Sequence, residues 1–470
     1  MKKEKLAQAL NEISDSHIAE AAAKKRRRPY WLGALAAVIA LVLVFRYVEI
    51  PLAVHARAVA LASDFRFTQR PKEAQYPNRE DYRAALNAWL DANATRADTA
   101  TAALTDLNTF FKESCRTFLS GTRENALYSP LNAYIGLAMA AELTGGNTHR
   151  QLLDTLGTED VQALRSQTSA LWESVYKNDG NEICTLANSL WLDNSLDFNQ
   201  SVMDILGHDY YCSVYQRNLN GSRAPKDIGA WLNNNTGGLL KSYTQEVQLP
   251  EETILAIYST IYFQSKWGDE FRASNNTQDV FHAPTGDTTC TYMNAKLRQM
   301  DYYWGDSFGA VSLWLNNRCS MWFILPDPDK TIDDVLAEGQ YLDMVYTFEN
   351  AYENTKYMKV NLSVPKFDIS TQTDLRSGLE SMGITDLFDF KLADFSPAFE
   401  GMASITSAKQ SVRVAIDEQG VTAAAYIELP GAGAAQPPEE IIDFVLDRPF
   451  LFLITGVHGE PLFAGTVNQP

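Results

Sequence analysis

The sequence predicts an α+β fold with a large, mainly antiparallel sheet, preceded by one transmembrane helix. Strand-like and helical patterns follow one another in mixed order with few β–α–β alternations, which favours antiparallel sheets. The chain has 470 residues, of which 46% are apolar, and this is enough to bury a large core. One long apolar stretch, Pro29–Ile50, lies near the N-terminus and accounts for the expected transmembrane helix.

Residues 1–28 are predicted to form a cytoplasmic tail and residues 29–50 a transmembrane signal anchor. About 20 helical residues span a bilayer core. The basic run Lys24–Arg28 directly precedes the apolar stretch, which predicts that the tail stays in the cytoplasm and that the rest lies outside the cell. A secretory signal peptide is the rival interpretation, with cleavage sites at Ala58–Ala60 or Ala60–Ala62. A buried core helix is a third interpretation of the apolar stretch. The short tail and anchor favour a bacterial source.

Residues 51–102 are predicted to form a loosely packed juxtamembrane spacer with a short helix at Glu80–Ala92, and residues 103–470 a compact domain. Apolar residues at a spacing of about 3.6 indicate helices, and short apolar runs indicate strands. The helical segments of the domain are Ala103–Leu119, Pro130–Leu143, Asn199–Leu206, Ala224–Ser242, Ile332–Glu338 and Thr373–Met382. The strand-like runs are Cys184–Leu192, Leu255–Phe263, Ala310–Trp314, Met321–Leu325, Met358–Phe367, Val412–Ile416 and Phe450–Thr455.

Charge and residue content argue against several classes of protein. The net charge of −18 disfavours nucleic-acid binding, because phosphates would be repelled. The five cysteines are scattered, which predicts buried free thiols rather than a disulfide framework and leaves open whether one pair is bridged. The six histidines are equally dispersed, so no metal is expected. No catalytic, nucleotide or cofactor motif is present, and we predict neither an enzyme nor a cofactor.

The stretch from Gly420 to Pro438 combines a strand pattern with a flexible tether. Small and apolar residues alternate with polar ones from Val421 to Leu429, which is typical of a strand with one buried face. Residues 431–435 are all glycine or alanine, which is typical of an exposed, cleavable segment. The expected buried face consists of Val421, Ala423, Ala425, Ile427 and Leu429, and the opposite face of Thr422, Ala424, Tyr426 and Glu428.

The domain resembles the serpin family, because a series of short motifs occurs in that family's order. Each motif is weak alone, but the ordered series is specific. The motifs are Asn125–Pro130, Leu137–Ala140, Gly145–Thr148, Trp231–Gly238, Ile261–Trp267, Leu362–Phe367, Ala393–Ser396, Arg448–Phe452 and Leu462–Gly465. The resemblance implies a serpin-like fold with a large central sheet, further sheets, about nine helices and an exposed reactive-centre loop at about residues 418–440.

The resemblance also implies a function. In serpins a serine or cysteine protease attacks the loop as it would attack a substrate and forms an acyl-enzyme. The hinge side of the cleaved loop then inserts into the large sheet, and the protease stays trapped. The chain would thus be a suicide substrate, and we expect it to be a monomer. The hinge residues are Glu418, Gly420, Val421, Thr422, Ala423, Ala424 and Ala425.

Counting by family spacing from Glu418 places the reactive bond at Ala434–Ala435, with the cut confined to residues 432–436. The Pro437–Glu439 segment supports this count. Ala434 would enter the primary specificity pocket of the protease, and a small residue there favours elastase-like or subtilisin-like targets. Pro430 lacks a backbone N–H and would cost one ladder hydrogen bond in the inserted strand.

The residues that control sheet opening depart from the family pattern. The resemblance assigns Ser129, Asn132, Trp267 and Gln410 to this region, and serpins usually have serine and histidine where Asn132 and Gln410 stand. A third departure is Gly229, where asparagine is usual. We predict that the polar cluster is rebuilt around an Asn132–Gln410 amide pair.

Two other functions remain open at this stage. A serpin-like binding protein would keep the fold but its loop would not insert, whereas Gly420 and the alanines after it favour inhibition. A membrane-anchored hydrolase would need a catalytic triad assembled from distant residues.

Overall fold

The computed structural model describes residues 54–62, 71, 73–178, 183–236, 247–251, 253–316, 319–345, 352–421 and 439–470. Residues Leu52–Pro470 form one compact unit. The predicted tail and transmembrane anchor, residues 1–50, lie outside the described residues. In the part of the chain that is described, no helix is long and apolar enough to cross a membrane.

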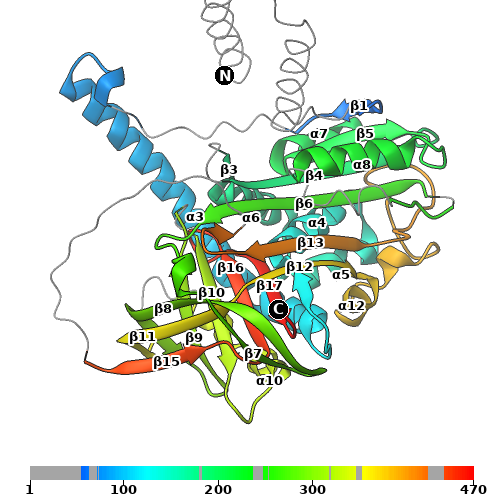
Figure 1. Ribbon diagram of the computed structural model, residues 1–470. Helices are drawn as coiled ribbons and strands as arrows, with labels where there is room; N and C mark the ends of the chain where they lie inside the picture. The colour runs from blue at the N-terminus through cyan, green and yellow to red at the C-terminus, as the bar shows by residue number, and fades with distance from the viewer. Residues whose placement is uncertain are drawn as a thin grey trace, which may run out of the picture. The chain divides into compact units, whose positions relative to one another are not determined.

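Sheet A has eight strands and carries the candidate functional site. Their order is β1-β5-β4-β6-β14-β13-β12, with β3 paired to β4, and β4, β6, β13 and β12 lie side by side in Figure 1. All neighbours are antiparallel except β4 and β5. The strands are β1 (Arg57–Ala60), β3 (Lys177–Asn178), β4 (Ile183–Asp193), β5 (Cys212–Arg217), β6 (Leu255–Lys266), β12 (Phe367–Asp374), β13 (Lys409–Ile416) and β14 (Gly420–Val421).

Sheet B has nine strands in the order β15-β11-β8-β9-β10-β16-β17-β2, with β7 paired to β8. Only β11 and β15 are parallel neighbours. Strands β16 and β17 are buried along their whole length and form part of the main core. The strands are β2 (Ala126–Tyr128), β7 (Thr277–Ala283), β8 (Gly286–Trp304), β9 (Phe308–Trp314), β10 (Ser320–Pro326), β11 (Thr355–Pro365), β15 (Ile441–Val445), β16 (Phe450–Thr455) and β17 (Pro461–Val467).

Nine α-helices lie within the described residues, which agrees with the expected number. Helix α4 is buried at all but one of its positions and packs against both β6 and β17, so it lies between the two sheets. The helices are α3 (Arg79–Leu119), α4 (Pro130–Leu143), α5 (Gly146–Leu156), α6 (Val161–Val175), α7 (Gln200–Asp209), α8 (Ala224–Asn235), α10 (Ile332–Glu338), α11 (Gln340–Asp343) and α12 (Arg376–Ser381). The short 3-10 helices are Glu73–Gln75, Ala273–Asn275 and Asp386–Phe388.

The N-terminal part of the unit differs from the predicted spacer. The expected helices Glu80–Ala92 and Ala103–Leu119 are a single helix, α3, which has 41 residues. Asn78 begins it, because its side-chain oxygen accepts hydrogen bonds from the next turn's backbone N–H groups. Residues Arg57–Ala60, also predicted to pack loosely, form an edge strand that pairs with β5.

Two further predictions are corrected. The apolar run Met358–Phe367 is not one strand: β11 ends at Pro365 and β12 begins at Phe367, so the run crosses from sheet B to sheet A. The helix expected to start at Thr373 starts at Arg376, because residues up to Asp374 continue β12.

The expected free thiols are confirmed. All five cysteines are unbridged, and four of them are buried. Burial raises the pKa of the Cys115 thiol to about 12, so this group stays protonated at neutral pH.

Candidate functional site: an open strand position in sheet A

Strand β13 is followed by a tight turn that returns the chain to sheet A. Asp417 organises this turn: its Oδ1 accepts hydrogen bonds from the backbone N–H groups of Gln419 at 2.8 Å and Gly420 at 3.2 Å. The N–H of Asp417 donates in turn to the carbonyl oxygen of Gly420 at 3.0 Å. A short polar side chain that bonds to the backbone two residues on is a common way to fix such turns.

The two residues after the turn, Gly420 and Val421, form β14 between β6 and β13. Gly420 pairs with Lys266, and Val421 pairs with Ser265 on one side and Ile416 on the other. A Cβ atom on Gly420 would clash with the Ser265 carbonyl oxygen and lie 2.6 Å from the Lys266 Cα, so only glycine fits. The Val421 side chain is buried. The predicted hinge therefore already occupies the first two positions of a central strand.

Glu418 fixes the start of this strand to the neighbouring elements. Its carboxylate forms an ion pair with Lys366 and accepts a hydrogen bond from Asn276 Nδ2. Its carbonyl oxygen accepts the N–H of Phe271 at 3.0 Å. Burial alone would raise the pKa of the Glu418 carboxyl, but the hydrogen bonds from Lys366 and Asn276 outweigh it and the pKa is lowered.

Trp267 covers the turn from the end of β6. Its indole N–H donates to the carbonyl oxygen of Asp417 at 2.8 Å, and its backbone N–H donates to that of Gln419 at 3.0 Å. The side chain is buried and meets the ring of Phe271 edge to face, with centroids 6.0 Å apart. Movement of the turn would break these contacts, and the predicted role of Trp267 in sheet opening stays a prediction.

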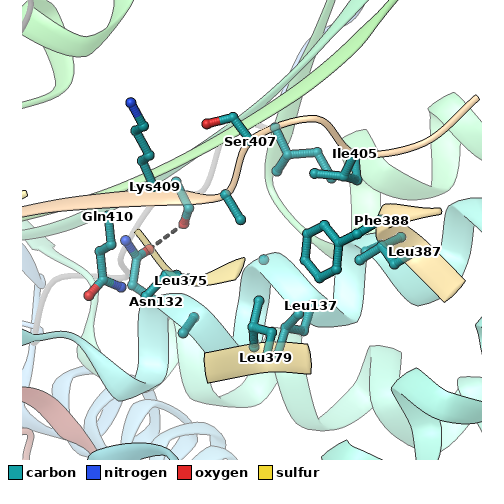
Figure 2. A pocket seen from close by; sticks show the side chains of 16 residues that line it. Asn132, Leu137, Leu375, Leu379, Leu387, Phe388, Ile405, Ser407, Lys409 and Gln410 are labelled. Carbon is teal, nitrogen blue, oxygen red and sulfur yellow. Dashed lines mark hydrogen bonds between the residues drawn. The ribbon is translucent and has the colours of Figure 1, made fainter. Parts of the chain in front are cut away.

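Beyond β14, no described strand lies between β6 and β13. In the described part of sheet A these two strands pair with β14 and not with each other. A cavity of about 100 Å³ lies there, lined by Ile257 and Ser259 of β6 and by Ala408 and Gln410 at the start of β13. Figure 2 shows its mainly apolar floor, formed by Leu137 of α4 and by Leu375, Leu379, Leu387, Phe388 and Ile405.

Buried amides hold the cavity's polar end. Gln410 bonds twice to the backbone of Ser129: its Oε1 accepts the N–H at 2.7 Å, and its Nε2 donates to the carbonyl oxygen at 3.0 Å. The Ser129 hydroxyl donates to the Leu462 carbonyl at 2.6 Å. These contacts tie β13 to the start of α4 and to sheet B.

The Asn132 side chain has different partners, so the predicted Asn132–Gln410 pair is wrong. The Ser259 hydroxyl lies between the Oδ1 atoms of Asn132 and Asn188, at 2.6 Å from the latter (Figure 2 shows the Asn132 contact). A hydroxyl has one proton, so it donates to one amide at a time. The physical reason for the error is that the Gln410 amide is aligned with the Ser129 backbone, whereas the Asn132 Oδ1 meets the Ser259 hydroxyl.

The distal end of the loop leads into the edge of sheet B. Strand β15 pairs in parallel with β11, and Ile441 on it is 56% exposed. Lys356 and Glu440 form an exposed ion pair at 2.6 Å, and Asn361 Nδ2 donates to Asp443 at 2.7 Å. This end is thus held by surface contacts.

The predicted site residues are distributed as follows. Glu418, Gly420, Val421 and Trp267 meet at the top of the open position, and Ser129 and Gln410 meet at its polar end. Gly229 lies on the buried part of α8. The hinge residues Thr422–Ala425 and the reactive bond Ala434–Ala435 lie outside the described residues. The residues that the sequence did not single out are Lys366, Asn276, Ser259 and Asn188.

The described part of sheet A thus has the two residues of β14 between β6 and β13, with a pocket further along the same two strands. The chain belongs to the serpin family: the family model "Serpin (serine protease inhibitor)" matches residues 105–470. The family is one of protease inhibitors, which confirms that the chain is not an enzyme.

Relatives come from distant organisms. Serpin-Z1C of Triticum aestivum is 26% identical over 367 residues, which cover 74% of this chain and 90% of the relative. Plasminogen activator inhibitor 1 of Mus musculus is 28% identical over 359 residues, covering 74% and 87%. A serpin-like protein of the archaeon Thermococcus kodakarensis is also 28% identical, over 363 residues covering 75% and 82%. The identities to plant, mammalian and archaeal relatives are similar, so they do not favour a prokaryotic source over others.

Solved structures agree in fold. The thermophilic serpin tengpin in its native state matches with a TM-score of 0.68 at 23% identity, covering 78% of this chain and 93% of tengpin. Thyroxine-binding globulin in complex with thyroxine matches with a TM-score of 0.63 at 20% identity, covering 79% and 99%.

Proposed function

We propose that the chain is a suicide-substrate inhibitor of serine proteases, in which cleavage of the loop lets its hinge side continue β14 down the open position in sheet A. The observation that carries this proposal is β14 itself: its two residues pair with β6 and β13, and no other described strand lies between these two. The family match and relatives such as plasminogen activator inhibitor 1 support inhibition.

The register of β14 indicates where the following residues would lie. Each step forward along the loop is one step back along both β6 and β13. Ala423 and Ala425 would enter the upper part of the gap, where small side chains meet the least resistance. Ile427 would then lie between Ser259 and Gln410, and Leu429 between Ile257 and Ala408. These four neighbours line the cavity.

The energetics favour insertion after cleavage. Full burial of Ile427 or Leu429 would each contribute about 1.5–3 kcal/mol, and each added ladder hydrogen bond about 0.5–1.5 kcal/mol. Pro430 follows directly, cannot donate to the ladder and limits this gain. If insertion stopped short, the chain would be the alternative, a serpin-fold binding protein. Thyroxine-binding globulin shows that a binding protein can use this fold.

We place the reactive bond at Ala434–Ala435, with an elastase-like or subtilisin-like protease as the target. The full chain is incubated with each type of protease and analysed on a denaturing gel. A covalent band that survives SDS supports trapping, whereas clean cleavage with full protease activity contradicts it and favours the binding protein.

A matched pair of variants tests insertion itself. Ala425→Arg would bring a charge to the buried face of the new strand, and we expect it to convert the inhibitor into a substrate. Ala424→Arg is the control: the same change one residue earlier faces outward and should keep the covalent band. Equal behaviour of the two variants would contradict the proposed register.

We also propose that residues 29–50 anchor the domain outside the cell, with the N-terminus in the cytoplasm. The basic run before the apolar stretch supports this orientation. A full-length chain that stays in the membrane after an alkaline carbonate wash supports the anchor. A released chain that begins shortly after Ala60 or Ala62 would instead support a cleaved signal peptide.

A further inference from the structure

Strand β1 builds a pocket that the serpin domain alone would not have. It precedes the family match, which starts at residue 105. Arg57 and Ala58 pair with Gln216 and Tyr215 of β5, so β1 extends sheet A at its edge. The N–H of His55 donates to Asp227 of α8 at 3.2 Å, which fixes the start of this segment against the helix.

The pocket lies between this segment, the end of β5 and the turn before α8, and its charged lining is entirely basic. Three arginines, Arg57, Arg217 and Arg223, line it together with the His55 imidazole, and no carboxylate side chain is among the lining residues. The chain as a whole carries a net charge of −18, so a concave basic site stands out against its surroundings.

Two of the three guanidinium groups, those of Arg217 and Arg57, have side-chain partners that hold them in place. Arg217 is mostly buried and forms an ion pair with Asp227, which neutralises it and orients it. Arg57 donates to the side-chain oxygen of Gln216 at 3.2 Å. Among the described residues neither Arg57 nor Arg223 has a carboxylate partner, and Asn218 adds an amide to the lining.

We propose that this pocket binds a phosphate- or sulfate-bearing anion. Arginine forks bind the oxygens of such tetrahedral anions in pairs, and Arg57 of β1 and Arg223 before α8 both line this pocket. The anion can be free or can belong to a lipid headgroup. The second source rests on the proposed anchor, which would end at Ile50, shortly before His55 in the sequence.

The test uses the full chain in a non-ionic detergent at constant ionic strength. Inorganic phosphate is titrated in by calorimetry, with chloride as the reference. In a second arm the protein is mixed with phosphatidylglycerol-doped micelles and compared with phosphatidylcholine-doped ones. We expect saturable binding of phosphate, and preference for phosphatidylglycerol when the source is a lipid.

Three variants make the result specific. Arg57→Gln and Arg223→Gln should each weaken binding about tenfold, as expected for loss of hydrogen bonds to a charged group. Arg83→Gln is the matched control, because Arg83 is an exposed arginine on α3 outside the pocket. Thermal unfolding in chloride checks that each variant is folded. The Arg57 variant also loses its hydrogen bond to Gln216. If that loss destabilises the protein, the conclusion is drawn from Arg223→Gln alone.

Absence of saturable binding in both arms would overturn the proposal, as would equal weakening by the Arg83 control. Loss of anion binding with protease trapping intact separates this inference from the proposed inhibition. Preference for phosphatidylglycerol without phosphate binding assigns the site to the lipid headgroup.

Discussion

The two ends of the loop are held in opposite ways. The hinge end enters an interior strand position, where Val421 is buried and Glu418 is tied to two partners. The distal end leaves along an edge strand, where Ile441 is exposed and the ion pair Lys356–Glu440 lies in solvent. The difference indicates that Gly420 and Val421 are part of the interior of sheet A, whereas the chain from Ile441 joins sheet B at its edge.

The largest expected effect comes from removing a side chain that would fill the cavity. Ile427→Ala should lower the stability of the cleaved, inserted form by about 2–5 kcal/mol, while the uncleaved form changes little. Thermal or denaturant unfolding of both forms measures this. Equal destabilisation of the two forms would show that Ile427 does not enter the cavity on insertion.

Glu418→Gln tests the polar anchor of the hinge and should cost about 1.5–3 kcal/mol, as loss of hydrogen bonds to a charged group does. Because the pKa of Glu418 is lowered in the folded state, its contribution is complete above the ordinary carboxyl pKa and is lost as the pH falls through the lowered value. The difference in unfolding temperature between wild type and variant should therefore shrink below about pH 4. A constant difference down to acidic pH would contradict the ion pair.

Gly420→Ala tests the fit at the first inserted position. A Cβ there would push against the Ser265 carbonyl and the Lys266 Cα, so we expect a destabilisation of about 1–3 kcal/mol. Gly401→Ala offers a contrast, because no atom lies within 4 Å of a Cβ there and only the positive φ of +121° opposes it. A neutral Gly420→Ala would mean that β14 leaves sheet A readily.

The smallest effect is expected at the distal end. Lys356→Ala removes an exposed ion pair with Glu440 and should cost less than about 1 kcal/mol. Protease trapping should keep its rate, measured as the second-order rate constant of inhibition. A large loss of trapping would show that the distal end also controls insertion.

Much of the fold followed from local patterns. The apolar run Val412–Ile416 predicted a strand, which β13 confirms, and Val421, the first residue of the alternating stretch, is buried beside Ile416. The rest of that stretch, Thr422–Leu429, lies outside the described residues. The ordered motifs gave the family. Each strand pattern and each motif consists of a few consecutive residues, so it can be recognised without knowing the three-dimensional contacts.

The errors came where distant residues decide the outcome. The polar segment between Ala92 and Ala103 carries no clear apolar stripe, so the continuity of α3 was missed. The ion pair Lys366–Glu418 joins the link between β11 and β12 to the turn between β13 and β14, and no spacing rule connects them. Gln410 and Asn132 were paired because both replace usual family residues, but Gln410 bonds to the Ser129 backbone and Asn132 to the Ser259 hydroxyl, and both partners are distant in sequence.

The pocket of about 100 Å³ between β6 and β13 has a consequence for the proposed inhibition. Its lining is mainly apolar, and apolar surface that stays in contact with water is unfavourable. Under the proposed function, Ile427 and Leu429 would cover this surface only after a single peptide bond of the loop is cut. Part of the free energy that traps the protease would then come from packing that is completed only after the cleavage.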